Sequence, residues 1–127
     1  MAEATTKARL RCREIMTANV RTVAGDAPIS EVATLMKEGD VGSVPVVEGG
    51  KLVGIVTDRD IVVRAVAEGK GPETPVSTAM TTEIFSVTPE DFVFEAVRLM
   101  GEKQVRRIPV VNADGALAGI IAMADIA

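Results

Sequence analysis

An internal repeat constrains the fold of this 127-residue chain more than any other feature of its sequence. Short matching segments return 64 positions later, and they begin at Met16, Glu31, Leu35, Val41 and Pro45. Three further matches, which begin at Leu52, Gly54 and Asp60, return 65 positions later. A unit of about 60 residues is near the lower limit for burying a sufficient core alone. We therefore expect two similar units that hide their sheet faces against each other about a pseudo-two-fold axis.

Each unit is expected to contain the same order of strands and helices. Runs of β-branched residues predict strands, and apolar residues at helical spacing predict helices. The first unit is predicted to have a strand over 20–23, a helix from the cap Asp26 to Gly39 with Pro28 in its first turn, strands over 43–47 and 52–56, and a helix over 58–68. The second unit repeats this order and has its own helix-start signal in Thr88–Asp91.

The segment boundaries follow from the repeat and from one stretch rich in Gly and Pro. Residues 69–75 are predicted to be a linker, because Gly and Pro interrupt helices and strands. The first repeat is expected over residues 12–68 and the second over 76–127, and residues 1–11 are expected to form an N-terminal tail.

The end of the sequence departs from the repeat. A helix of about ten residues should follow Asp125, since helices of 8–20 residues are typical, yet the sequence ends at Ala127. An apolar groove would then be left on the second unit. Three coverings stay open for it: the basic N-terminal segment, a partner chain, or further residues of a longer chain.

The corner Gly54–Asp60, where a strand leads into a helix, carries the first candidate site. The first N–H groups of a helix lack intrahelical partners and favour an anion such as phosphate. At this corner, the Asp60 carboxylate could accept hydrogen bonds from the vicinal diol of a ribose. Thr57 and Asp60 also fit a capping box, in which both side chains only cap the helix. Both interpretations stay open, and the repetition of the corner favours a functional role.

Composition argues against several classes of function. The net charge of −4 and an aromatic content of 2% argue against nucleic acid as a partner. The chain has no His and one Cys, so the usual metal ligands and nucleophile–base pairs are missing. We therefore expect no metal site, no catalytic residues and no enzymatic activity. No export signal or membrane-spanning run is visible, which predicts a cytoplasmic protein without a membrane partner.

Three motifs stand out in the chain: the Met-Thr pair, the Pro-Val-Val strand and the Gly-Ile-Val-Thr-Asp-Arg-Asp corner. Together with their repeats, they closely resemble a tandem pair of cystathionine β-synthase (CBS) domains, the Bateman module. The resemblance covers residues 12–127 and extends to the small stand-alone prokaryotic members. It implies an α+β fold of two pseudosymmetric β-α-β-β-α repeats packed sheet to sheet. It also implies a homodimer, in which four CBS units form a disk, and a protein partner acting in trans.

The function implied by the resemblance is non-catalytic regulation. An adenosine-containing ligand, such as AMP, ADP, ATP or S-adenosylmethionine, would bind in the cleft between the repeats, and no cofactor would be obligatory. The first cleft would use Thr57 and Asp60 for ribose and phosphate, Ile84 and Val105 around the adenine, and Arg106 or Arg107 for phosphate. The two arginines also fit a second interpretation, a charged and exposed strand edge.

The second cleft departs from the family pattern. It would be formed by Val20, Val41, Ser43 and Asp125. Ala122 stands where the hydroxyl residue is expected, and Gly42-Ser43 stand where the first cleft has its arginines, so weaker binding is predicted there. Two other functions remain open. A structural dimerisation module without ligand is the main alternative, and an enzyme based on carboxylates is the third.

Overall fold

The computed structural model describes residues 7–126 of the chain, which form two compact units. The central unit is Arg21–Ile84, and the terminal unit combines the chain up to Val20 with the chain from Phe85 onward. Each unit contains helices and one two-stranded sheet, which confirms the predicted α+β class with two repeats. None of the described helices has the length and hydrophobicity that crossing a lipid bilayer requires.

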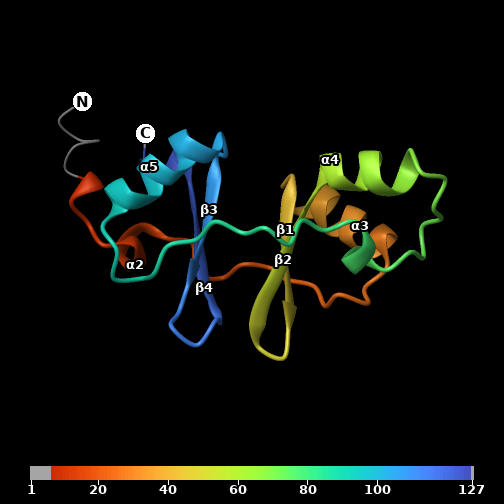
Figure 1. Ribbon diagram of the computed structural model, residues 1–127, viewed down its shortest axis with the longest axis horizontal. Coiled ribbons are helices and arrows are strands. Elements are labelled where there is room, and N and C mark those ends of the chain that lie inside the picture. The colour runs from red at the N-terminus through yellow and green to blue at the C-terminus, as the bar shows by residue number, and fades with distance from the viewer. Residues whose placement is uncertain (1–6, 127) are drawn as a thin grey trace. The chain divides into compact units, whose positions relative to one another are not determined.

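The central unit is a helix-covered hairpin (Figure 1). Its elements are α3 (Ile29–Gly39), β1 (Ser43–Glu48), β2 (Lys51–Thr57), α4 (Asp58–Ile61), the π-helical η1 (Val62–Val66) and the 3₁₀ helix η2 (Val76–Thr78). The strands are antiparallel, with Val44 opposite Val56. The buried face of α3, which includes Val32 and Met36, packs on the apolar side chains of this hairpin. The apolar residues that alternate along the strands and those at helical spacing on α3 therefore pack into one aliphatic core.

The terminal unit has the same plan. Its elements are α2 (Cys12–Ile15), α5 (Val93–Lys103), β3 (Arg107–Val111), β4 (Leu117–Ala122) and α6 (Met123–Ile126). Ile108 of β3 lies opposite Ile121 of β4, and both are buried. Val93 and Met100 lie on the buried face of α5 and belong to the same apolar cluster as Ile108 and Ile121. The predicted strands over 43–47 and 52–56, and their repeats, are thus close to the observed hairpins.

The starts of the two long helices differ from the predictions. Helix α3 has Pro28 as its N-cap instead of Asp26, and α5 has Phe92 instead of a residue in Thr88–Asp91. Backbone carbonyls replace the expected side-chain caps. The N–H of Ile29 donates to Thr74 O (2.9 Å), and the N–H of Val93 donates to Leu10 O (2.8 Å).

These contacts give the linker and the N-terminal segment the same structural role. Each supplies a carbonyl oxygen to the first turn of a long helix, where N–H groups have no partner within the helix. The segment predicted as a strand over 20–23 is also different, because it forms only an isolated parallel bridge between Val23 and Val46.

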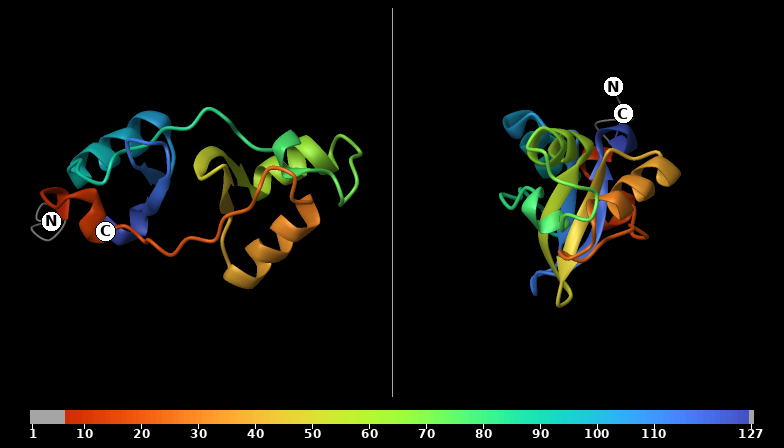
Figure 2. Two further views of the ribbon diagram at one scale, coloured as in Figure 1. Left: turned by 90° about the horizontal axis from the view of Figure 1, so that it is seen from below. Right: turned by 90° about the vertical axis from the view of Figure 1, so that its right-hand side faces the viewer.

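The first residues of each repeat complete the other unit. Met80 and Thr81 lie near the start of the second repeat, but Thr81 exchanges two backbone hydrogen bonds with Ile55 of the central unit (2.9 and 2.8 Å). Thr17 exchanges two such bonds with Ile120 of the terminal unit (2.9 and 3.0 Å). The chain therefore passes from one unit to the other twice, near residue 20 and near residue 84 (Figure 2).

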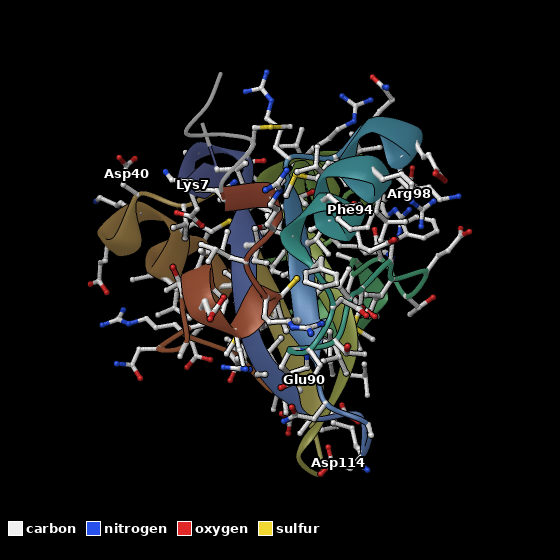
Figure 3. The ribbon with its side chains drawn as sticks, turned by 90° about the vertical axis from the view of Figure 1, so that its left-hand side faces the viewer. Lys7, Asp40, Glu90, Phe94, Arg98 and Asp114 are labelled. Atoms are coloured by element: carbon white, nitrogen blue, oxygen red, sulfur yellow. The ribbon has the colours of Figure 1, made fainter. Side chains whose placement is uncertain are left out.

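The N-terminal segment is part of the terminal unit's core. Leu10, Ile15 and Met16 pack on the buried cluster that contains Ile126 of α6. Lys7, labelled in Figure 3, donates from Nζ to the carbonyl oxygen of Asp125 (3.4 Å). Of the three coverings considered for this unit, the structure thus shows contacts from the N-terminal segment. Residues 1–6 of the expected N-terminal tail lie outside the described residues.

The single cysteine, Cys12, should make the stability of the folded protein depend on pH. Burial of Cys12 and the negative charge of Asp91 raise the pKa of its thiol from 9.0 to about 11. The neutral thiol therefore favours the folded state, and this contribution is complete below pH 9 and is lost as the pH rises toward 11. We expect the urea midpoint of the wild type to fall more steeply over that interval than the midpoint of Cys12→Ala. Equal slopes would contradict the assignment, because lysine titration affects both proteins alike.

Candidate functional site

The candidate site is built on the corner between β2 and α4. Thr57 ends the strand in an extended conformation (φ −109°, ψ 164°) and is the N-cap of the helix. The N–H of Asp60 donates to Thr57 Oγ1, and the N–H of Thr57 donates to Asp60 Oδ2, each at 3.0 Å. The capping box considered from the sequence is therefore present. It brings the two predicted ribose-binding residues together at a fixed spacing.

Two further residues contact the Asp60 carboxylate. The Thr81 hydroxyl lies 3.3 Å from Oδ2 and 3.5 Å from Oδ1. The guanidinium of Arg64 lies with Nε 3.9 Å from Oδ1, while its Nη1 donates to Met80 O at 3.1 Å. The side chain of Asp60 is 13% exposed, so these contacts enclose most of it.

These two contacts were not predicted from the sequence. Arg64 lies four residues after Asp60 on the same helical segment, which is a spacing at which opposite charges pair. That signal was available in the sequence. Thr81 belongs to the repeated Met-Thr pair, but its contact with a residue 21 positions away has no local signal.

The corner keeps hydrogen-bonding capacity for a ligand. Each carboxylate oxygen has two lone pairs, and the capping bond from Thr57 N occupies one lone pair of Oδ2. The Thr81 hydroxyl approaches the other lone pair of Oδ2, so a ribose hydroxyl can donate to Oδ1, which accepts no backbone N–H. The Thr57 hydroxyl accepts from Asp60 N, and its own hydrogen has no acceptor among the described residues. Capping and ribose binding are thus chemically compatible at this corner.

The other predicted residues of the first cleft are divided between the two units. Ile84 is the last residue of the central unit and is half-buried. Val105, Arg106 and Arg107 belong to the terminal unit, where Val105 is half-buried and both arginines are exposed at the start of β3. Neither guanidinium forms an ion pair with the described residues. The structure therefore brings Thr57 and Asp60 together and leaves the role of the arginines as a prediction.

The corresponding corner of the terminal unit is simpler. The N–H of Ala122 donates to Asp125 Oδ2 (2.9 Å), but Ala122 has no hydroxyl to accept a bond in return. Asp125 thus keeps one half of the capping box. Of the other residues predicted here, Val20 is half-buried in the terminal unit, while Ser43 is half-buried and Val41 exposed in the central unit.

Known proteins share this sequence pattern and fold. A family model for the CBS domain matches the chain at residues 12–66 and again at 76–127. The CBS domain-containing protein YhcV of Bacillus subtilis (strain 168) is 44% identical over 115 residues, which cover 91% of this chain and 81% of that protein.

Two solved structures extend the comparison. Hypoxic Response Protein I, crystallised with two coordinated zinc ions, is 34% identical with a TM-score of 0.84, and the match covers 92% of this chain and 96% of that one. In the described part of the present chain, no three His, Cys, Asp or Glu side chains gather where they could hold a metal ion. CBSX2, solved in complex with AMP, is 29% identical with a TM-score of 0.82, and the match covers 91% and 92% of the two chains.

These matches agree with the repeated corner and hairpin in each half of the chain. The family model covers nearly all of the sequence, in two copies separated only by the linker region. The chain therefore belongs to the CBS-domain family as a tandem pair of CBS domains.

Proposed function

We propose that this protein is a non-catalytic regulatory module that binds an adenosine-containing ligand at the corner formed by Thr57 and Asp60. One observation carries the proposal. The Asp60 carboxylate is held in place by the Thr57 N–H and still has free lone pairs for a diol. The AMP complex of the related protein CBSX2 supports an adenine nucleotide as the ligand. The ligand would favour whichever arrangement of the protein it binds more tightly, and a protein partner would respond to that arrangement.

The phosphate-binding part of the proposal concerns Arg106 and Arg107. Both are exposed and have no ion pair with the described residues. Their guanidinium groups are well suited to bidentate hydrogen bonds with phosphate oxygens. If they serve this purpose, Arg106→Ala and Arg107→Ala should weaken the binding of AMP and leave the binding of adenosine unchanged.

We also propose that the corner at Asp125 binds more weakly than the corner at Asp60. Ala122 offers no hydroxyl, and the positions that correspond to the two arginines are Gly42 and Ser43. A single strong site per chain should result. Two equivalent sites in a calorimetric titration would show that this asymmetry has no effect on binding.

The main test is a thermal-shift panel with AMP, ADP, ATP, S-adenosylmethionine and NAD. Each ligand is measured with the wild type, with Asp60→Ala and with the matched control Asp125→Ala. A ligand at a hundred times its dissociation constant should stabilise the fold by about 2.7 kcal/mol. We expect at least one ligand to stabilise the wild type and Asp125→Ala but not Asp60→Ala.

The result also decides between the two main functions. If no ligand stabilises the wild type, the sensor function is refuted and the structural dimerisation module becomes the better account. If Asp60→Ala still responds as the wild type does, the ligand binds elsewhere. Loss of the cap alone would lower the melting temperature of the free Asp60→Ala protein, so the shift is always taken relative to each protein without ligand.

A homodimer is part of the proposed function. Val62, Val63 and Val66 are exposed on the helix that follows the Asp60 corner. Apolar residues on one helix face are suited to a contact with the same face of a second copy. A monomer mass in sedimentation equilibrium would contradict this part of the proposal.

A further inference from the structure

We propose that Thr81 is a positioning residue that orients the Asp60 carboxylate toward the ribose diol of the ligand. This inference rests on the proposed function, because it specifies how the same corner recognises ribose. Thr81 would not contact the ligand. It would act through Asp60, from the first residues of the second repeat, which complete the central unit.

The backbone of Thr81 is fixed in a way that suits this role. Its N–H donates to Ile55 O (2.8 Å), and its carbonyl oxygen accepts from Ile55 N (2.9 Å). Ile55 lies on β2, only two residues before the N-cap Thr57. The Thr81 hydroxyl is therefore presented to Asp60 from a backbone attached to the same strand that leads into the corner.

The hydroxyl of Thr81 faces both oxygens of the carboxylate. Its distances of 3.3 and 3.5 Å are longer than the 2.5–2.7 Å of a strong hydrogen bond between a hydroxyl and a carboxylate. A contact of this length limits rotation of the carboxylate. Together with the Thr57 N–H it engages both lone pairs of Oδ2, and it leaves Oδ1 to accept from the ligand. The ligand diol would thus meet a carboxylate that is already oriented, which reduces the entropy lost on binding.

Arg64 reinforces this arrangement from the helix. Its Nε lies 3.9 Å from Asp60 Oδ1, and its Nη1 donates to the carbonyl oxygen of Met80, the neighbour of Thr81. The carboxylate is therefore enclosed by the capping N–H of Thr57, the hydroxyl of Thr81 and the guanidinium of Arg64. The charge of Arg64 also partly compensates the negative charge of Asp60.

The terminal unit provides an internal comparison. Thr17 corresponds to Thr81 and forms the same pair of backbone bonds, in its case with Ile120. The side chain of Thr17 is exposed and has no hydrogen bond to Asp125 in the described structure, whereas Thr81 is half-buried against Asp60. The repeated Met-Thr pair therefore explains the backbone pairing in both units, and the contact with a carboxylate is specific to Thr81.

The test compares Thr81→Val, which keeps the shape but removes the hydroxyl, with Thr81→Ser, which keeps the hydroxyl. Thr17→Val is the matched control. The dissociation constants of AMP and 2′-deoxy-AMP are measured by calorimetry for each protein. Because removal of one hydrogen bond typically costs about 1 kcal/mol, we expect Thr81→Val to bind AMP about fivefold more weakly. Thr81→Ser and Thr17→Val should bind AMP as the wild type does.

The ratio of the two dissociation constants is the decisive measurement. Thr81→Val should lower the preference for AMP over 2′-deoxy-AMP, since only AMP presents both hydroxyls to Asp60. Partial unfolding of a variant would weaken the binding of AMP and of 2′-deoxy-AMP equally and leave the ratio of the two dissociation constants unchanged. An unchanged ratio in Thr81→Val, or an equal effect of Thr17→Val, would overturn the inference while the proposed function stands. Failure of the wild type to bind any adenine nucleotide would instead refute both.

Discussion

Gly119→Ala is expected to lower the free energy of unfolding by about 1–3 kcal/mol, the usual cost of adding a methyl group to a well-packed site. A Cβ atom at Gly119 would lie 2.7 Å from the backbone oxygen of Thr17 and 2.8 Å from the sulfur of Met16. Thr17 is held there by its two hydrogen bonds with Ile120, so its carbonyl cannot retreat without breaking them. Urea denaturation followed by circular dichroism measures the loss.

The corresponding glycine in the central unit is the matched control. A Cβ atom at Gly54 would lie 2.5 Å from the sulfur of Met80, and the nearest backbone atom, Thr81 O, would be 3.1 Å away. The Met80 side chain is flexible and can move. We therefore expect Gly54→Ala to cost less than Gly119→Ala. If the two variants lost equal stability, the close backbone approach would not be the cause.

Ile121→Ala is expected to have the largest effect on stability, a loss of about 2–5 kcal/mol, as for other fully buried Ile residues. Ile121 is 0% exposed and lies opposite the buried Ile108 in the β3–β4 hairpin. Met100 of α5 belongs to the same cluster, so truncation leaves a cavity between the helix and the sheet.

The same denaturation experiment measures this change, with Val97→Ala as its control. Val97 is exposed on α5, and its truncation should alter the free energy of unfolding by less than about 0.5 kcal/mol. A small effect of Ile121→Ala would mean that the terminal unit contributes little to the measured unfolding transition. A large effect of Val97→Ala would mean that the loss of stability does not depend on burial.

Local patterns predicted the hairpins well and the helix starts poorly. The run Ser43–Val47 predicted nearly all of β1, because strand pairing within a hairpin depends on neighbouring residues. The first turns of α3 and α5 instead use the carbonyl oxygens of Thr74 and Leu10, which are distant in the sequence. A single sequence does not reveal such partners, so the side-chain caps suggested by Asp26 and Thr88 were wrong.

In the candidate site too, the contact between neighbouring residues was predicted, and the contact between residues distant in the sequence was not. Thr57 and Asp60 are three positions apart, so their mutual hydrogen bonds follow from helix geometry and were expected. The contact of Asp60 with Thr81 arises because the first residues of the second repeat belong to the central unit. The repeat alone does not tell in which unit each copy of that segment lies. The roles of Arg106 and Arg107 stay predictions from the family resemblance.

The first residues of each repeat pair with the other unit, and this pairing determines which unit can be completed first during synthesis. The central unit is one continuous stretch, Arg21–Ile84, so it can fold as soon as that stretch leaves the ribosome. Thr17 must wait for Ile120, its hydrogen-bonding partner near the end of the chain. At a translation rate of about 5–20 residues per second, the wait is on the order of 5 to 20 s. A segment made before the central unit thus finds its hydrogen-bonding partner only after that whole unit has been made.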